Sequence, residues 1–363
     1  MRVLLLLDNG ASPLARTDCD VLLAHLDRTR IQPIVASLRG SVGDIHLKGR
    51  FRFDPRLIFR LQRLIRREKI ELVHVLEQAA LPIAGRARAA GVPLIGTIYR
   101  YEGGTTPRSY LLSSLRYRVL LQGVDQITVP FENVRRALLL LYRHPHPITV
   151  ISPGLLAPAK DEASSNREAL GLPEGALIVM VLPPEFPTSQ LLLDRAELAL
   201  ELLKYLIRKV PDVHLAVVGS GNFTSAMQRA AMNYRPGLPV VWCGERSEAE
   251  QWAILEQAAV YVDVASAGEV SPGLIRAALA GKPIVAPNIV SVHEVIETNV
   301  CGILVEAQNA AEFAAQIARL MQYEGLAGRL GRVAQKRAEE RFSVAAQIQA
   351  LTVFYEQTVY EGR

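Results

Sequence analysis

Cysteine is scarce in this 363-residue chain, and its hydrophobic runs are short. The three cysteines, Cys19, Cys243 and Cys301, are far apart and lack metal-ligand spacing, so we expect reduced, mostly buried thiols. The longest apolar runs, 3–7 and 178–182, have the length of strands and fall short of the roughly 20 residues that a membrane helix needs. The chain enters a strand at once, without a signal-peptide pattern. We therefore expect a cytoplasmic protein.

Several classes of site have no counterpart in the sequence. It contains no nucleophile triad pattern, no metal-binding cluster and no Walker-type loop. We therefore expect neither a metal nor another cofactor. Half of the residues are hydrophobic (50%) and 21% are charged, which is typical of a globular protein. The length predicts two domains of about 150–200 residues each.

The net charge of +5 is mild but unevenly distributed. Nine cationic residues crowd into one stretch: Lys48, Arg50, Arg52, Arg56, Arg60, Arg63, Arg66, Arg67 and Lys69. Apolar residues recur at helical spacing between 54 and 67, so the stretch predicts a basic amphipathic helix. One interpretation is a solvated face on a helix that covers the sheet. The other is a peripheral contact with anionic lipid headgroups at the inner membrane face. Nucleic acid is not expected, because no interleaved aromatics or binding motif accompany the charge.

Apolar runs of strand length alternate with helical patterns along the whole chain. The expected strands are 3–7, 34–37, 72–75, 93–98, 126–129 and 148–151, then 177–182, 213–218, 240–243, 260–264 and 284–286. Continuous apolar strands separated by helices are typical of parallel sheets that are covered on both faces. The alternation restarts after Ser152-Pro153-Gly154. The sequence thus predicts an α/β protein with two doubly wound, Rossmann-like domains, with ligands in the cleft between them at the carboxyl ends of the strands.

The segment from 260 to 287 predicts a strand, a Gly-containing loop and a helix. Ser271 is expected to cap this helix, and Pro272 and Gly273 follow in its first turn. The helix should stop at Gly281, after which a strand resumes. Because backbone N–H groups and the helix dipole both face outward at a helix start, the turn at 271–273 is a candidate phosphate site.

Several motifs occur in a familiar order along most of the chain: Val-Ile-Ser-Pro-Gly at 150–154, Pro-Asp-Val-His-Leu-Ala-Val-Val-Gly-Ser-Gly at 211–221, Ala-Leu-Ala-Gly-Lys-Pro-Ile-Val at 278–285 and Gly-Ile-Leu-Val at 302–305. In this respect the sequence resembles the retaining GT-B glycosyltransferases of family 4. The resemblance implies an N-terminal acceptor domain over 1–152 and a nucleotide-sugar donor domain over 153–340. It also implies a final helix over 341–363 that returns to the N-terminal domain.

The resemblance also suggests which residues bind the donor. The turn Gly219-Ser220-Gly221 is either a tight strand-to-helix turn or a place of close backbone approach to the nucleotide. Arg246 lies in the loop that in the family is near the base, and Gly10 is the single glycine of the loop after the first strand. The 271–273 turn would meet the diphosphate.

The sequence departs from the family pattern where substrates are bound. Arg276 stands where the family has the second glutamate of its donor motif, the one that holds the ribose hydroxyls. Glu269 is one place away from the first glutamate, and it is either a sugar contact or a loop carboxylate. The family's Arg and Lys after the first strand of the donor domain are missing from 181–190. Tyr99 and Arg100 replace a histidine near the reacting groups. We therefore predict Glu269 and Arg100 as catalytic residues, with Arg100 supplying replacement charge.

Two interpretations of function follow from these observations. The first is a metal-independent glycosyltransferase that moves a sugar from a nucleotide diphosphate to a glycan or lipid-linked acceptor, with acceptor contacts at His74 and Tyr99. For His74, a strand-end histidine with a satisfied hydrogen bond is the competing explanation. The second interpretation is a GT-B protein without turnover that binds a glycan, a nucleotide or a partner protein. The missing Arg, Lys and second glutamate of the family pattern favour the second, and the intact scaffold with its glycine turns favours the first.

Overall fold

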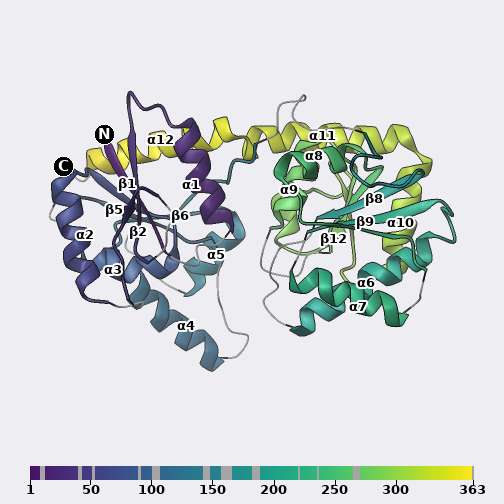
Figure 1. Ribbon diagram of the computed structural model, residues 1–363, viewed down its shortest axis with the longest axis horizontal. Coiled ribbons are helices and arrows are strands. Elements are labelled where there is room, and N and C mark those ends of the chain that lie inside the picture. Colours follow the sequence, from purple (N-terminus) through teal and green to yellow (C-terminus); the bar gives the residue numbers. More distant parts are fainter. Residues whose placement is uncertain are drawn as a thin grey trace. The chain divides into compact units, whose positions relative to one another are not determined.

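The computed structural model of the protein describes residues 1–8, 13–39, 43–50, 54–88, 91–99, 107–141, 148–156, 166–181, 189–219, 221–234, 237–264 and 270–361. The chain forms two compact units (Figure 1). The first unit comprises Met1–Gly154 and Ser343–Arg363, and the second comprises Leu155–Phe342. Each unit contains one sheet, and all of the pairings between the named strands are parallel. The predicted class, two doubly wound α/β units, is confirmed.

The first unit has the strand order β3-β2-β1-β4-β5-β6-β7. Its strands are β1 (Arg2–Leu7), β2 (Gln32–Ser37), β3 (Ile45–His46), β4 (Leu72–Val75), β5 (Leu94–Thr97), β6 (Gln126–Val129) and β7 (Ile148–Val150). Its helices are α1 (Pro13–His25), α2 (Arg56–Arg67), η1 (Gln78–Ala80), α3 (Leu81–Arg86), α4 (Pro107–Leu120), α5 (Glu132–Leu141) and α12 (Val344–Glu361).

The helices of the first unit lie on both faces of its sheet. The connections from β3 through to β7 all advance in one direction, so right-handed crossovers place α2, α3, α4 and α5 on one face. The connection from β1 to β2 runs the other way and places α1 on the opposite face, where α12 contacts it (Figure 1). This double covering explains why every residue from Val3 to Leu7 is fully buried.

The second unit has the strand order β10-β9-β8-β11-β12-β13. Its strands are β8 (Ala176–Val181), β9 (Val213–Val218), β10 (Val240–Gly244), β11 (Val260–Val262), β12 (Ile284–Pro287) and β13 (Ile303–Val305). Its helices are α6 (Ser189–Leu206), α7 (Asn222–Tyr234), α8 (Glu248–Glu256), α9 (Pro272–Leu279), η2 (Val292–Glu294), α10 (Ala310–Gln322) and α11 (Glu324–Phe342). Helix α6 packs against α7 and α10, while α9 packs against α11.

Two local details differ from the sequence-based expectation. The helical pattern that separates the predicted strands 72–75 and 93–98 covers 79–90, but the structure has a 3₁₀ turn at 78–80 followed by the short α3, which ends at Arg86. Pro82 stands in the first turn of α3, where its missing N–H costs no helical hydrogen bond, so α3 begins only at Leu81. The two-residue strand β3 was not expected, because it pairs only two residues at the sheet edge.

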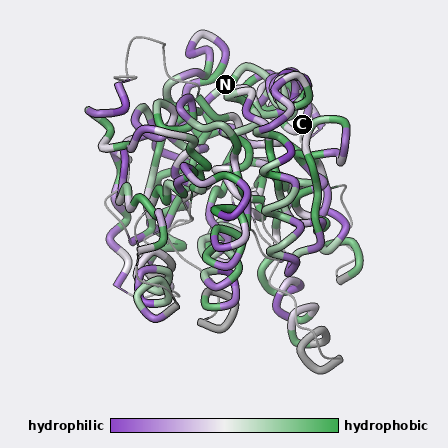
Figure 2. The backbone as a smooth tube through the Cα atoms, turned by 90° about the vertical axis from the view of Figure 1, so that its right-hand side faces the viewer, coloured by the Kyte–Doolittle hydropathy of each residue, from purple (hydrophilic) through white to green (hydrophobic). Residues whose placement is uncertain are grey.

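Hydropathy follows this layered arrangement. Hydrophobic and hydrophilic segments alternate along the backbone (Figure 2). None of the helices in the described ranges combines the length and the apolarity that crossing a membrane requires.

Candidate functional site

The sheet of the second unit has a switch point at its centre. From β8 the chain moves outward through β9 to β10, and it then returns to β11 on the other side of β8 before moving on to β12 and β13. The registers Val260 to Ile178 and Tyr261 to Val179 place β11 directly beside β8. In doubly wound sheets the crevice at the carboxyl ends of such strands is the usual ligand site. The candidate site is therefore at the ends of β8 and β11.

Helix α9 begins beside this switch point. The Ser271 hydroxyl caps it by accepting from the Leu274 N–H at 3.4 Å, and Pro272 is in the first turn, as predicted. Gly273 follows, and a Cβ there would be 2.6 Å from the Tyr261 hydroxyl and 2.8 Å from Cβ of Val181. Only glycine therefore lets the start of α9 approach the ends of β8 and β11 so closely. The fold thus directs a positive helix end to the switch point.

Two charged residues at this place were not recognised in the sequence. Asp263 comes directly after β11, and Arg195 projects from α6; both are buried. Burial lowers the pKa of Arg195 below its ordinary value, and the nearby Asp263 carboxylate opposes that shift. Arg195 Nη1 also lies 3.4 Å from the Ala307 carbonyl oxygen. The sequence signal was a charged residue inside the apolar stripe of α6, and it becomes informative only once the fold brings Arg195 near Asp263.

Arg276 forms an ion pair with helix α8. Its Nη2 lies 2.6 Å from Glu248 Oε1, and its Nη1 donates to Gln251 Oε1 at 3.1 Å. The Arg276 side chain is 12% exposed, whereas that of Glu248 is 56% exposed. The positive charge that replaces an acidic residue of the family is thus matched by a carboxylate from the neighbouring helix.

Arg246 is held within the second unit by several contacts. It donates to the Cys243 carbonyl at 2.9 Å and to Glu250 Oε1 at 2.8 Å, and its Nη2 lies 3.5 Å from the Leu170 carbonyl oxygen. Glu250 and Ser247 form the capping box of α8. The bonds from Arg246 and Ser247 lower the pKa of Glu250 to about 2. A ligand contact by Arg246 would therefore have to add to, or displace, these bonds.

The turn after β9 uses backbone conformations that favour glycine. Gly219 and Gly221 have positive φ values of 129° and 107°. The Gly219 N–H donates to the Gly244 carbonyl at 2.8 Å, which ties the ends of β9 and β10 together. The Thr224 hydroxyl donates back to the Gly219 carbonyl at 3.0 Å. The turn therefore has a structural role at the carboxyl edge of the sheet, and this role is compatible with close approach of a nucleotide.

His74 is in β4 at the centre of the first unit. It is 1% exposed, its Nδ1 lies 2.5 Å from the Tyr355 hydroxyl, and its Nε2 lies 2.6 Å from Thr97 Oγ1. Thr97 continues the chain of contacts to Thr128 Oγ1 at 2.7 Å. Burial lowers the pKa of His74 to about 3. An acceptor contact at His74 would require one of the two ring contacts to break.

Tyr99 belongs to a second buried polar group in the same unit. Its hydroxyl donates to Asp18 Oδ2 at 2.7 Å, and Gln347 Nε2 donates to Asp18 Oδ1 at 3.0 Å. Gln347 Oε1 in turn accepts from the Gly154 N–H at 2.9 Å. Burial raises the pKa of Asp18 to about 6 against the effect of these two hydrogen bonds. His74 thus connects β4 to α12 through Tyr355. Tyr99 connects to α12 through Asp18 of α1, which also accepts from Gln347.

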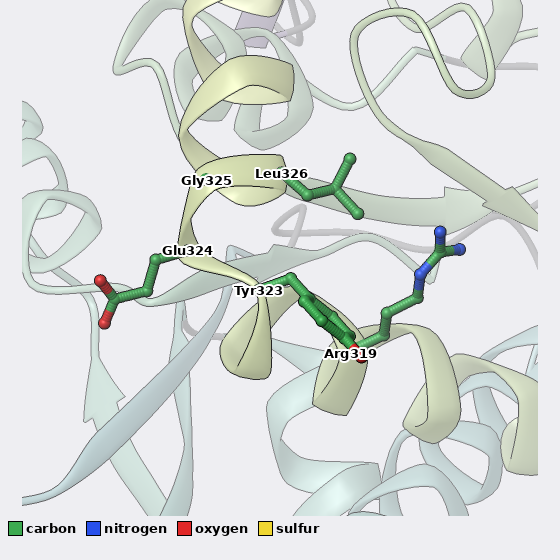
Figure 3. Close-up of a pocket in the computed structure, with 5 residues that line it drawn as sticks. All are labelled: Arg319, Tyr323, Glu324, Gly325 and Leu326. Atoms are coloured by element: carbon green, nitrogen blue, oxygen red, sulfur yellow. The ribbon is translucent and has the colours of Figure 1, made fainter.

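The remaining predicted residues, Gly10, Arg100, Ser220 and Glu269, lie outside the described residues. A surface pocket of about 590 Å³ lies elsewhere in the second unit, at the junction of α10 and α11 (Figure 3). Its lining is Arg319, Tyr323, Glu324, Gly325 and Leu326, and it includes none of the predicted donor residues. The switch point remains the candidate site on topological and electrostatic grounds.

Comparison with known proteins agrees with this architecture. The chain matches the family models "Glycosyltransferase Family 4" over residues 11–157 and "Glycosyl transferases group 1" over residues 191–323. No curated protein sequence matches it. Among solved structures it is similar to Alr3699/HepE of Anabaena in complex with UDP and glucose, with a TM-score of 0.74 and 16% identity over 98% of this chain and 99% of that chain.

Two further structures show the same fold. A glycosyltransferase from Rickettsia africae superposes with a TM-score of 0.75 and 16% identity over 99% of this chain and 98% of that chain. Sucrose-phosphate synthase from Thermosynechococcus elongatus superposes with a TM-score of 0.75 and 16% identity, covering 98% of each chain. These similarities extend over both units, and the two family models match one part of the chain each. The chain belongs to the GT-B glycosyltransferases of family 4 and is a sugar transferase.

Proposed function

We propose that the protein transfers a sugar from a nucleotide diphosphate donor to a glycan or lipid-linked acceptor, without a metal ion. The observation that carries this proposal is the start of α9 at the switch point, where Gly273 allows the helix to approach β8 and β11. A helix start in this position favours an anionic group such as a diphosphate. HepE, a similar structure, binds UDP and UDP-glucose, which supports a nucleotide sugar as the donor here.

We assign the donor to the domain 153–340 and the acceptor to the domain 1–152, with the segment 341–363 completing the acceptor domain. The turns at 219–221 and 271–273 would contact the nucleotide and its diphosphate through the backbone. Glu269 would contact the sugar, and Arg100 would supply replacement positive charge for the reaction.

The departing diphosphate needs positive charge in this mechanism. The start of α9 supplies part of it, and fixed dipoles and cations aimed at developing charge are typically worth a few kcal/mol of barrier each. Arg195 is a buried cation near Asp263, which directly follows β11, and Asp263 partly balances its charge. We propose that Arg195 adds to the field at the diphosphate and so compensates in part for the cations missing from 181–190.

Calorimetric titration with UDP, GDP and ADP, each with and without EDTA, tests the donor site. We expect saturable binding of one nucleotide that EDTA leaves unchanged. Glu269→Ala should weaken binding of the corresponding nucleotide sugar by about tenfold or more, the usual effect of losing a hydrogen bond to a charged group, while the free nucleotide binds as before. Glu324→Ala changes a carboxylate in the α10–α11 pocket and is the matched control.

Two outcomes would contradict parts of the proposal. If the wild-type protein binds none of the nucleotides, the donor site is wrong. If it binds a nucleotide sugar but releases no nucleotide diphosphate when a lipid and glycan extract is added, it binds without turnover.

The variants Arg195→Gln and Arg195→Lys separate the effect of charge from the effect of packing. Nucleotide affinity should fall for Arg195→Gln and largely remain for Arg195→Lys.

A further inference from the structure

Helix α2 has an exposed cationic face. Its buried side chains are Leu57, Leu61, Leu64 and Ile65, which anchor the helix to the first unit. The exposed positions of the helix are Arg56, Phe59, Arg60, Arg63, Arg66 and Arg67. Phe59 is 72% exposed in the middle of these arginines, and the helix contains no acidic residue. A phenylalanine exposed among cations, on a helix without acidic residues, is the composition of an interfacial helix.

Helix α4 adds an exposed apolar stripe. Leu112, Leu115 and Val119 are 67%, 50% and 55% exposed. Their spacing of three and four residues places them on one side of the helix. Arg116 and Arg118 are exposed in the same helix, which also contains no acidic residue. This helix therefore combines an apolar stripe with positive charge.

The two helices lie in one layer of the first unit. The crossovers from β3 to β4 and from β5 to β6 advance in the same direction, so α2 and α4 cover the same face of the sheet. Helix α3 contacts both of them (Figure 1). Because each helix turns its buried residues toward the sheet, the exposed residues of both point away from it. We call these exposed residues of α2 and α4 together the α2–α4 surface.

We propose that the α2–α4 surface docks on an anionic lipid bilayer, with the arginines at the headgroups and Phe59, Leu112, Leu115 and Val119 at the acyl boundary. The charge of the two helices is complementary to anionic headgroups, which attract arginines near the membrane surface. The aliphatic stripe on α4 distinguishes a bilayer from nucleic acid, because leucine and valine offer no stacking face to a base. Docking would bring the acceptor domain to lipid-linked substrates, but it does not depend on catalysis.

Vesicle flotation tests this proposal with the full-length protein. The wild-type protein should float with phosphatidylcholine vesicles that contain phosphatidylglycerol and remain at the bottom with phosphatidylcholine alone. Raising the salt concentration should weaken the binding, because exposed charges are screened. The triple variant Arg56→Gln, Arg63→Gln, Arg66→Gln should bind on the order of a hundredfold more weakly, at about fivefold for each arginine.

The apolar stripe is tested separately. Leu112→Ser with Leu115→Ser should weaken the binding by about tenfold, because less apolar surface enters the interface. Controls on the other face of the unit are Val353→Ser in α12 and Arg28→Gln after α1, which should bind like the wild type. Val353 is an exposed apolar residue, as the leucines are. Far-UV circular dichroism and thermal unfolding check that each variant is folded.

Three results would overturn the proposal. The first is failure of the wild-type protein to float with anionic vesicles. The second is unchanged flotation of the serine variant, which would leave only electrostatic adsorption. The third is binding to a single-stranded RNA oligonucleotide that is tighter than binding to anionic vesicles and insensitive to the serine substitutions. Nucleotide titration does not depend on vesicle binding, so failure of the membrane proposal and failure of the proposed function can be told apart.

Discussion

Asp18 provides a pH-dependent test of how the first unit is held together. Its carboxylate is buried between α1 and α12, where it accepts hydrogen bonds from Tyr99 and Gln347. Burial raises its pKa from 3.8 to about 6, although the two hydrogen bonds act in the opposite direction. The folded protein therefore binds this proton more tightly than the unfolded chain. The stability that Asp18 contributes is complete below its unfolded pKa of 3.8 and is lost as the pH rises through about 6.

The magnitude follows from the difference between the two pKa values. At about 1.36 kcal/mol per pKa unit, a rise from 3.8 to about 6 corresponds to about 3 kcal/mol of unfolding free energy. Asp18→Asn removes this titration and resembles the protonated carboxyl, since its Nδ2 can donate to Tyr99 while its Oδ1 accepts from Gln347. We expect the variant to gain up to about 3 kcal/mol relative to the wild type between about pH 4 and about pH 8.

His74 also makes the stability of the wild-type protein depend on pH, so the effect of Asp18 must be taken from the difference between Asp18→Asn and the wild type. Burial lowers its pKa from 6.5 to about 3, so the stability contributed by neutral His74 is present above pH 6.5 and is lost as the pH falls toward about 3. This trend opposes that of Asp18 in the wild-type curve and cancels in the difference between variant and wild type. Asp20→Asn, in the exposed part of the same helix, is the control.

Urea unfolding followed by far-UV circular dichroism measures the effect at each pH. Trp242 and Trp252 both belong to the second unit, so their fluorescence follows that unit by itself. A difference between Asp18→Asn and the wild type that stays constant across the pH range would refute the reasoning. It would mean that Asp18 has the same proton affinity in the folded and unfolded protein.

Two further predictions concern packing within each unit. Tyr355→Phe removes the hydroxyl that lies 2.5 Å from His74 Nδ1, and the resulting unpaired buried nitrogen should cost about 1–3 kcal/mol of unfolding free energy, measured in urea at neutral pH. Gly331→Ala in α11 places a Cβ 2.1 Å from the Gly281 carbonyl oxygen, so the second unit should lose about 1–3 kcal/mol, seen as a lower urea midpoint in tryptophan fluorescence. Gly325→Ala in the same helix meets nothing within 4 Å and should be neutral or stabilising, and equal effects of the two alanines would contradict this account.

Much of the fold is predictable from the sequence because the strands are buried on both faces. Strands at 72–75, 126–129 and 213–218 have the bounds that were expected, since a continuous apolar run leaves little choice of where a buried parallel strand begins and ends. The cap of α9 is predictable for a local reason, because Ser271-Pro272 combines a capping hydroxyl with a fixed φ angle. Strand β3 lacks such a pattern, because its two residues pair only at the sheet edge.

The candidate site is less predictable because its contacts are tertiary. Nothing local in the sequence joins Arg195 to Asp263, which come close enough to interact only in the folded second unit. The same is true of His74, whose environment depends on Tyr355 from the last helix. Local patterns therefore identify where a strand or helix ends, but they do not identify which distant side chain meets it there. The roles assigned to individual residues of the site remain predictions.

Arg276 shows why a single reversed charge does not define the electrostatics of a site. In the sequence, a cation replaces an acidic residue of the family pattern. In the structure, Glu248 lies 2.6 Å from this cation, so the pair has no net charge. The two side chains differ in exposure, at 12% for the arginine and 56% for the glutamate, so the member that faces solvent is the carboxylate. The exposed charge of this pair is therefore the carboxylate at the start of α8, which the largely buried Arg276 guanidinium holds in place.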